Sequence, residues 1–156
     1  MSRFLRMLVA VVVGFVLGSV VNMALVTVSG EVIPPPAEAD VTTMEGLKAS
    51  LHLFQPRHFI FPFLAHALGT LVGAFVACWL APARSPVPAY IVGGLFFLGG
   101  MANAFLLPAP IWFVAVDLLL AYLPAAWLGQ ALARRIPGGG TFGKDARHST
   151  RHGSSK

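Results

Sequence analysis

Four long runs of apolar residues constrain the fold of this chain more than any other feature. The runs cover about residues 4–28, 59–81, 87–107 and 111–133. An α-helix rises 1.5 Å per residue, so about 20 residues cross a hydrocarbon core of roughly 30 Å. Prolines such as Pro56, Pro82 and Pro108 stand near the breaks, where a residue without an amide donor ends or starts a helix. We therefore predict an all-α fold, a bundle of four transmembrane helices.

The composition supports a lipid environment. Apolar residues make up 56% of the 156 residues and charged residues only 11%, whereas a soluble domain has about 25% charged residues. The net charge of +5 would favour a nucleic-acid partner in a soluble protein. Here the positive charges lie at the ends of the apolar runs and in the tail, as orientation signals do. We expect the lipid bilayer as partner and no nucleic acid.

The first apolar run has two interpretations. Arg3 and Arg6 stand at its start and the small residues Ser29 and Gly30 follow it, as in a cleaved signal peptide. Its length exceeds the 7–15 apolar residues usual for a signal sequence, which favours a retained helix. Under either interpretation, the other three helices keep the same orientation.

Lysine and arginine residues predict the orientation of the bundle, because cytoplasmic loops carry an excess of them. With both termini inside, the outer side holds only Lys48 and Arg57. The inner side then holds nine basic residues: Arg3, Arg6, Arg84, Arg134, Arg135, Lys144, Arg147, Arg151 and Lys156. We therefore expect an N-in, C-in protein, by its general composition a multi-pass protein of a bacterial inner membrane.

Two segments lie outside the four runs. In the outer loop, residues 30–58, Thr42 and Glu45 have the spacing of a capping box, and Met44, Leu47, Leu51 and Phe54 follow at helical intervals. This pattern predicts a short amphipathic helix, either lying on the outer membrane surface or packed over the mouth of the bundle. The tail, residues 137–156, is glycine-rich, polar and basic, so we expect it to be disordered and to attract anionic lipid head groups.

Glycines mark the faces by which the helices are expected to pack. Small residues let two helix backbones approach closely in lipid, where close packing drives association. The first run contains Gly14 and Gly18, the second Gly69 and Gly73, and the third Gly99 and Gly100. These faces predict packing within the chain, with contact between two copies as the alternative.

One strong polar side chain lies in each run, at a similar depth. The four are Asp117, His66, Asn103 and Asn22, each roughly 7–12 Å from the outer edge by the helical rise. Polar groups in lipid are costly, so they turn inward and are candidates for function. We interpret this layer either as a hydrogen-bonded cluster that holds the helices together, or as an outward-facing site for a proton, a cation or a small polar ligand.

The sequence gives no catalytic motif. It contains no phosphate-binding loop and no nucleophile elbow, and the one cysteine, Cys78, lies in an apolar run, where it is expected to pack as a small apolar residue. We expect no enzyme activity, no metal and no cofactor. The first functional expectation is a structural or accessory role beside a membrane-protein partner. The second is a small, dimeric transporter or permeation unit that uses the polar layer.

Overall fold

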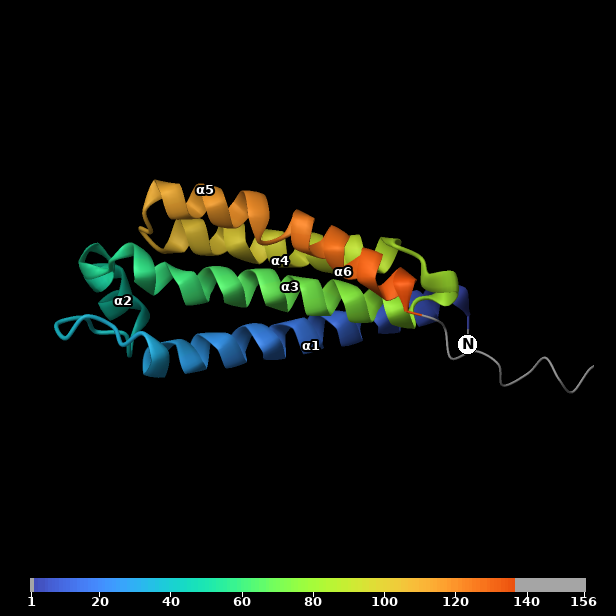
Figure 1. Ribbon diagram of the computed structural model, residues 1–156, viewed down its shortest axis with the longest axis horizontal. Coiled ribbons are helices and arrows are strands. Elements are labelled where there is room, and N and C mark those ends of the chain that lie inside the picture. Colours follow the sequence, from blue (N-terminus) through green and yellow to red (C-terminus); the bar gives the residue numbers. More distant parts are fainter. Residues whose placement is uncertain (1, 137–156) are drawn as a thin grey trace, which may run out of the picture.

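The computed structural model describes residues 2–136, and every regular element in this part of the chain is helical (Figure 1). The α-helices are α1 (Arg3–Val32), α2 (Met44–Ser50), α3 (Ile60–Leu80), α4 (Val87–Leu106), α5 (Ile111–Leu120) and α6 (Leu123–Arg135), with short 3-10 helices at Leu51–Leu53, Pro56–Phe59 and Pro82–Arg84. In this described part of the chain, four stretches are long and apolar enough to cross a membrane: α1, Pro56–Leu80, α4 and Ile111–Arg135. The prediction of an all-α protein with four such helices is confirmed.

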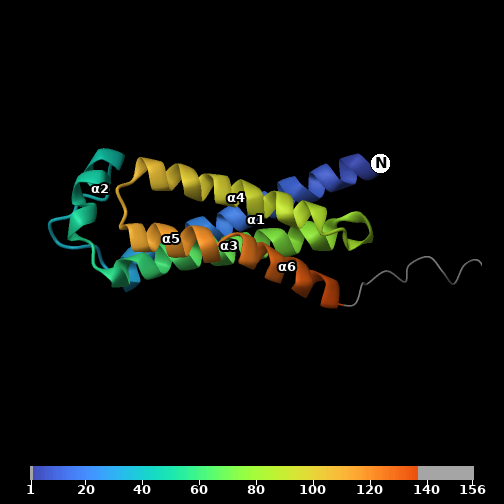
Figure 2. The same ribbon diagram turned by 90° about the horizontal axis from the view of Figure 1, so that it is seen from above.

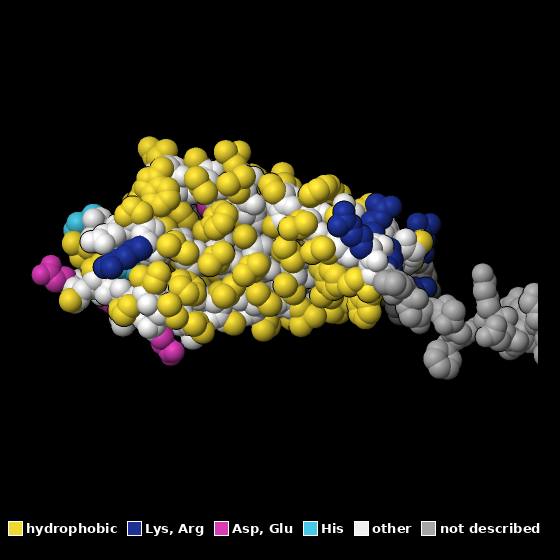
Figure 3. All heavy atoms as spheres, in the orientation of Figure 1, with side chains coloured by type: hydrophobic (Ala, Val, Ile, Leu, Met, Phe, Trp, Pro, Cys, Tyr) yellow, Lys and Arg dark blue, Asp and Glu magenta, His cyan; other side chains and the backbone are white. Residues whose placement is uncertain are grey.

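The surface is apolar around the middle of the bundle and charged at its two ends (Figure 3). Large side chains such as Phe105 and Ile111 are 85% and 87% exposed, as suits helices surrounded by lipid. We call one end the Arg84 end, because Arg84, the start of α1 and the last turn of α6 gather there (Figure 1). The opposite end, which α2 covers, is the α2 end (Figure 2).

Helices α1 and α3 pack backbone against backbone through glycine. A Cβ atom added at Gly18 would lie 2.5 Å from the carbonyl oxygen of Gly69, and one at Gly14 would lie 2.5 Å from that of Gly73. The reverse approaches, from Gly69 and Gly73 onto α1, are 2.8 and 2.9 Å. A real side chain does not fit at these distances, so glycine is required at this contact.

Other glycines in the described helices lie either in the interior or at the surface. A Cβ atom at Gly93 would lie 2.6 Å from the Cβ of Ala126 on α6, and Gly100 lies against the Tyr122 side chain. Gly129 of α6 approaches the α3 backbone, a contact that the sequence analysis did not propose. Gly99 meets open space. The structure therefore places Gly100 inside the bundle and leaves Gly99 out of the packing.

The Arg84 half of the bundle is filled by small residues. Ala74, Cys78, Ala89, Ala126 and Ala133 form one cluster, and each has no exposed surface. Side chains this small bring α3, α4 and α6 close together, as in other helical membrane proteins. Cys78 is thus buried among alanines, as expected for a small apolar residue.

The fourth span is broken, which corrects the single helix expected over residues 111–133. Helix α5 ends at Leu120, and α6 begins at Leu123. Pro124 is the second residue of α6; it has no amide hydrogen to donate to Leu120, and its ring would clash with that carbonyl group in a continuous helix. The break lets α5 diverge from the line of α6 at the α2 end (Figure 2).

The loop helix begins one residue later than expected. Thr43, not Thr42, is the N-cap of α2, and its hydroxyl accepts a hydrogen bond of 2.9 Å from the Gly46 amide. Thr42 instead bonds Asp40 through its amide and hydroxyl groups, at 2.8 and 2.6 Å. These bonds hold the pKa of the Asp40 carboxyl below its usual value.

The apolar face of α2 and of the following turn packs on the end of the bundle. Leu51 is buried in one cluster with Phe59 and Phe113, and Leu47 and Phe54 pack against this cluster. Leu47 is the residue of α2 in these contacts, whereas Met44 is 50% exposed; both placements expected for this segment stay predictions. The tail and its expected binding of anionic lipid lie outside the described residues.

Candidate functional site

Asp117 accepts hydrogen bonds from two side chains inside the bundle. Its carboxylate oxygens both lie 2.9 Å from Nδ1 of His66, and the Tyr122 hydroxyl donates to Oδ2 at 2.8 Å. Asp117 is only 4% exposed and Tyr122 only 1%. The three residues form a carboxylate–imidazole–phenol cluster between α3 and the two halves of the fourth span.

The helix break brings the third member into the cluster. Tyr122 lies between α5 and α6, at the N-cap position of α6, and its ring stacks on the His66 imidazole at 5.7 Å between centroids. Tyr122 was not among the site residues predicted from the sequence. The available signal was Pro124, since a helix broken just before proline can turn the adjacent tyrosine toward Asp117.

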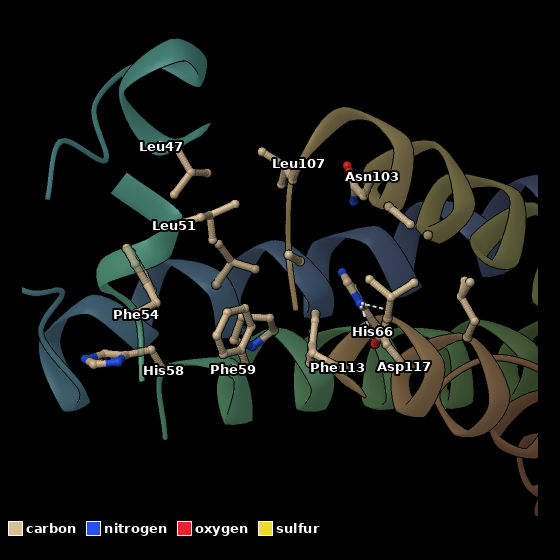
Figure 4. Close-up of a pocket in the computed structure, with 17 residues that line it drawn as sticks. Leu47, Leu51, Phe54, His58, Phe59, His66, Asn103, Leu107, Phe113 and Asp117 are labelled. Carbon is tan, nitrogen blue, oxygen red and sulfur yellow. Dashed lines mark hydrogen bonds and ion pairs between the residues drawn. The ribbon is translucent and has the colours of Figure 1, made fainter. Parts of the chain in front are cut away.

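A cavity of about 280 Å³ opens between this cluster and the segment formed by α2 and the turn that follows it. His66, Asp117 and Asn103 lie at its inner end (Figure 4). The rest of the wall is apolar except for His58 and consists mainly of Leu47, Leu51, Phe54, Phe59, Leu107 and Phe113. The cavity thus combines a hydrophobic body with a polar inner end, the usual make-up of a small-molecule site.

The two asparagines of the expected polar layer do not join the hydrogen-bonded cluster. Asn22 and Asn103 line a second cavity on the α1 side of His66, together with Ser19 and Tyr122. Asn103 and His66 line both cavities. Of the four predicted residues, the structure therefore brings His66 and Asp117 together, and it places Asn22 and Asn103 in the cavity walls beside them.

The cluster can exist in two charge states. An ionised carboxylate only accepts hydrogen bonds, so beside it Nδ1 of His66 carries a hydrogen. The second imidazole nitrogen faces away from Asp117 (Figure 4). With that nitrogen unprotonated the cluster has a net charge of −1, and with it protonated the cluster is neutral.

Comparisons of the chain with protein-family models, with curated proteins and with solved structures found no match. The class of protein is therefore inferred from the structure alone. Within residues 2–136, four helices are long and apolar enough to span a membrane, which indicates a multi-pass helical membrane protein. The described residues contain no group of three or more His, Cys, Asp or Glu side chains placed to hold a metal ion.

Proposed function

We propose that the protein binds a small amphiphilic molecule within the membrane, in the cavity beneath α2. The observation that carries the proposal is the position of the His66–Asp117 pair at the inner end of an apolar cavity. A cluster that only holds helices together needs no space beside it, since membrane helices associate through close packing. Here the cavity adjoins Asp117, whose carboxylate is the side chain with the highest cost of burial in the bundle.

The size and lining of the cavity define the ligand class. An apolar cavity of about 150 Å³ is known to hold one benzene molecule, and this cavity has a volume of about 280 Å³. Its apolar wall fits a ring or a short branched chain, and its inner end fits one polar or charged group. A small polar solute, one of the ligands expected from the sequence, would leave most of that wall without an apolar partner.

Filling the cavity tests the proposal. Ala104→Phe places a phenyl ring in the wall of the cavity, so binding of the neutral probe (3,3-dimethylbutyl)benzene is expected to fall at least about tenfold, or 1.4 kcal/mol. Binding is measured by equilibrium dialysis of the protein in lipid nanodiscs against empty nanodiscs. Ala102→Phe, on the exposed side of the same helix, is the matched control and keeps wild-type binding. Equal binding by both variants would refute the cavity as the site.

We propose that the protein lies in a bacterial inner membrane. Its α2 end faces outward, and both termini lie in the cytoplasm. Arg3, Arg84 and Arg135 support this orientation, since they belong to the Arg84 end and cytoplasmic segments are rich in arginine. Starting from Cys78→Ser, a single cysteine introduced as Glu45→Cys is expected to react with an impermeant maleimide in intact cells. Ser85→Cys is expected to react only after lysis. The opposite pattern would reverse the orientation.

Transport of the bound molecule is the second candidate function, and the break between α5 and α6 favours it. The break lies directly beside the site, at Tyr122, where α5 can move without carrying α6 with it. Proteoliposomes are expected to take up the trimethyl(2-phenylethyl)ammonium ion faster than protein-free liposomes. If uptake equals that of protein-free liposomes, the protein does not transport the ion, and only the proposed binding role stands. An accessory role beside another membrane protein stays a prediction.

A further inference from the structure

We propose that the ligand is a small organic cation, and that its entry displaces one proton from the His66–Asp117 pair. This inference rests on the binding site proposed above and specifies the chemistry of its ligand. It follows from the charges that surround Asp117, the aromatic rings of the cavity and the two protonation states of the pair.

No permanent positive charge lies beside Asp117 in the described part of the chain. The only ion pair found there is the one with His66, and neither cavity is lined by lysine or arginine. A buried carboxylate in an apolar medium is costly unless a positive charge accompanies it. That charge can be a proton on the pair or a cation in the cavity. If the proton and the cation were present together, the site would carry a net charge of +1, which is also costly to bury.

Charge balance therefore couples the two occupants. When the pair carries the additional proton, the empty site is neutral. When a monovalent cation enters and that proton leaves to water, the occupied site is again neutral. The proton is the only species released, and no covalent bond in the ligand changes. A neutral ligand of the same shape gives no such exchange.

The other groups that face the pair do not supply the missing charge. Tyr122, between α5 and α6, donates its hydroxyl hydrogen to Asp117. Asn103 of α4 and Asn22 of α1 are uncharged. His58, from Pro56–Phe59, is the remaining titratable residue in the cavity wall, and its Nδ1 accepts a hydrogen bond of 2.9 Å from the Gln55 amide. Proton release from His58 would persist without Asp117, which makes the two sources separable.

The aromatic wall also favours a cation. Phe54, Phe59 and Phe113 line the cavity, and the Phe59 and Phe113 ring centroids are 4.7 Å apart. The negative face of an aromatic ring attracts an ammonium group, most strongly where water is excluded. These rings and the Asp117 carboxylate thus attract the same charge.

The experiment compares two probes that differ only in charge. Trimethyl(2-phenylethyl)ammonium carries a permanent positive charge and no proton that titrates, and (3,3-dimethylbutyl)benzene is its carbon isostere. Binding to protein in phosphatidylcholine nanodiscs is measured by dialysis, and proton release by a pH indicator in weak buffer. We expect one proton released per cation bound at the pH where the pair is protonated. Over that range the cation affinity falls about tenfold for each unit decrease in pH, by reciprocal linkage.

The isostere is expected to bind without proton release and without pH dependence. Asp117→Asn is expected to lose most of the preference for the cation over the isostere, because only the aromatic rings remain to attract it, and to bind both probes without proton release. Equal binding of both probes to the wild type, or proton release that persists in Asp117→Asn, would overturn the cation inference and leave the binding site standing. If neither probe binds the wild type better than Ala104→Phe does, both the site and the inference are wrong.

Discussion

Gly18→Leu is expected to separate α1 from α3 and to lower the free energy of unfolding by about 3 kcal/mol, the upper end of the usual cost of overpacking. The new Cβ atom would lie 2.5 Å from the Gly69 carbonyl oxygen. That oxygen belongs to a helix backbone, which cannot rotate away as a flexible side chain would. The two helices must move apart, and the reciprocal contact at Gly14 and Gly73 is then lost as well. Unfolding in mixed detergent micelles, followed by circular dichroism, measures the effect.

Gly30→Leu is the matched control for this variant. Gly30 lies in the same helix, and a Cβ atom added there has no neighbour within 4 Å. The control is expected to unfold within about 0.5 kcal/mol of the wild type, as most surface substitutions do. If both variants were equally destabilised, the effect would come from leucine in α1 and not from the contact with α3.

Asp117→Ala is expected to lower the free energy of unfolding by about 1–3 kcal/mol, the cost of leaving a buried hydrogen-bond donor without a partner. The Tyr122 hydroxyl is the donor concerned, because it bonds Asp117 and is almost wholly buried. Unfolding in the same mixed micelles provides the measurement.

Asp117→Ala combined with Tyr122→Phe tests the physical reason. If the loss arises at the tyrosine hydroxyl, the double variant is more stable than the sum of the two single losses predicts. Strictly additive losses would place the effect elsewhere in the site.

The sequence alone was sufficient for the helical fold, because long apolar runs leave few alternatives in lipid. It also placed Gly14 and Gly18 on one helix face, and Gly69 and Gly73 on another, which the structure shows to be in contact. Spacing of four residues defines a face independently of any other helix. The pairing of the two faces required the structure.

The side-chain contacts in the site were harder to predict from the sequence, because they depend on how each helix is rotated about its axis. His66 and Asp117 meet, whereas Asn22 and Asn103, at similar depth, line cavities. Tyr122 enters the cluster only because the fourth span is broken, and Pro124 is a single residue within a long apolar run. The cavity is lined by residues of α1, α2, α3, α4 and α5, and no periodic pattern in the sequence marks such a set.

The stability of Asp117→Asn without any ligand tests the central claim most directly, which is that the carboxylate is kept for binding. Asparagine retains an oxygen that accepts from Tyr122 and removes the cost of a buried charge. We predict that the variant melts at the wild-type temperature or above it, in mild detergent, at each of several pH values. A clearly lower melting temperature would contradict the claim, because it would show that the fold itself needs the charged carboxylate and not only an oxygen that accepts from Tyr122.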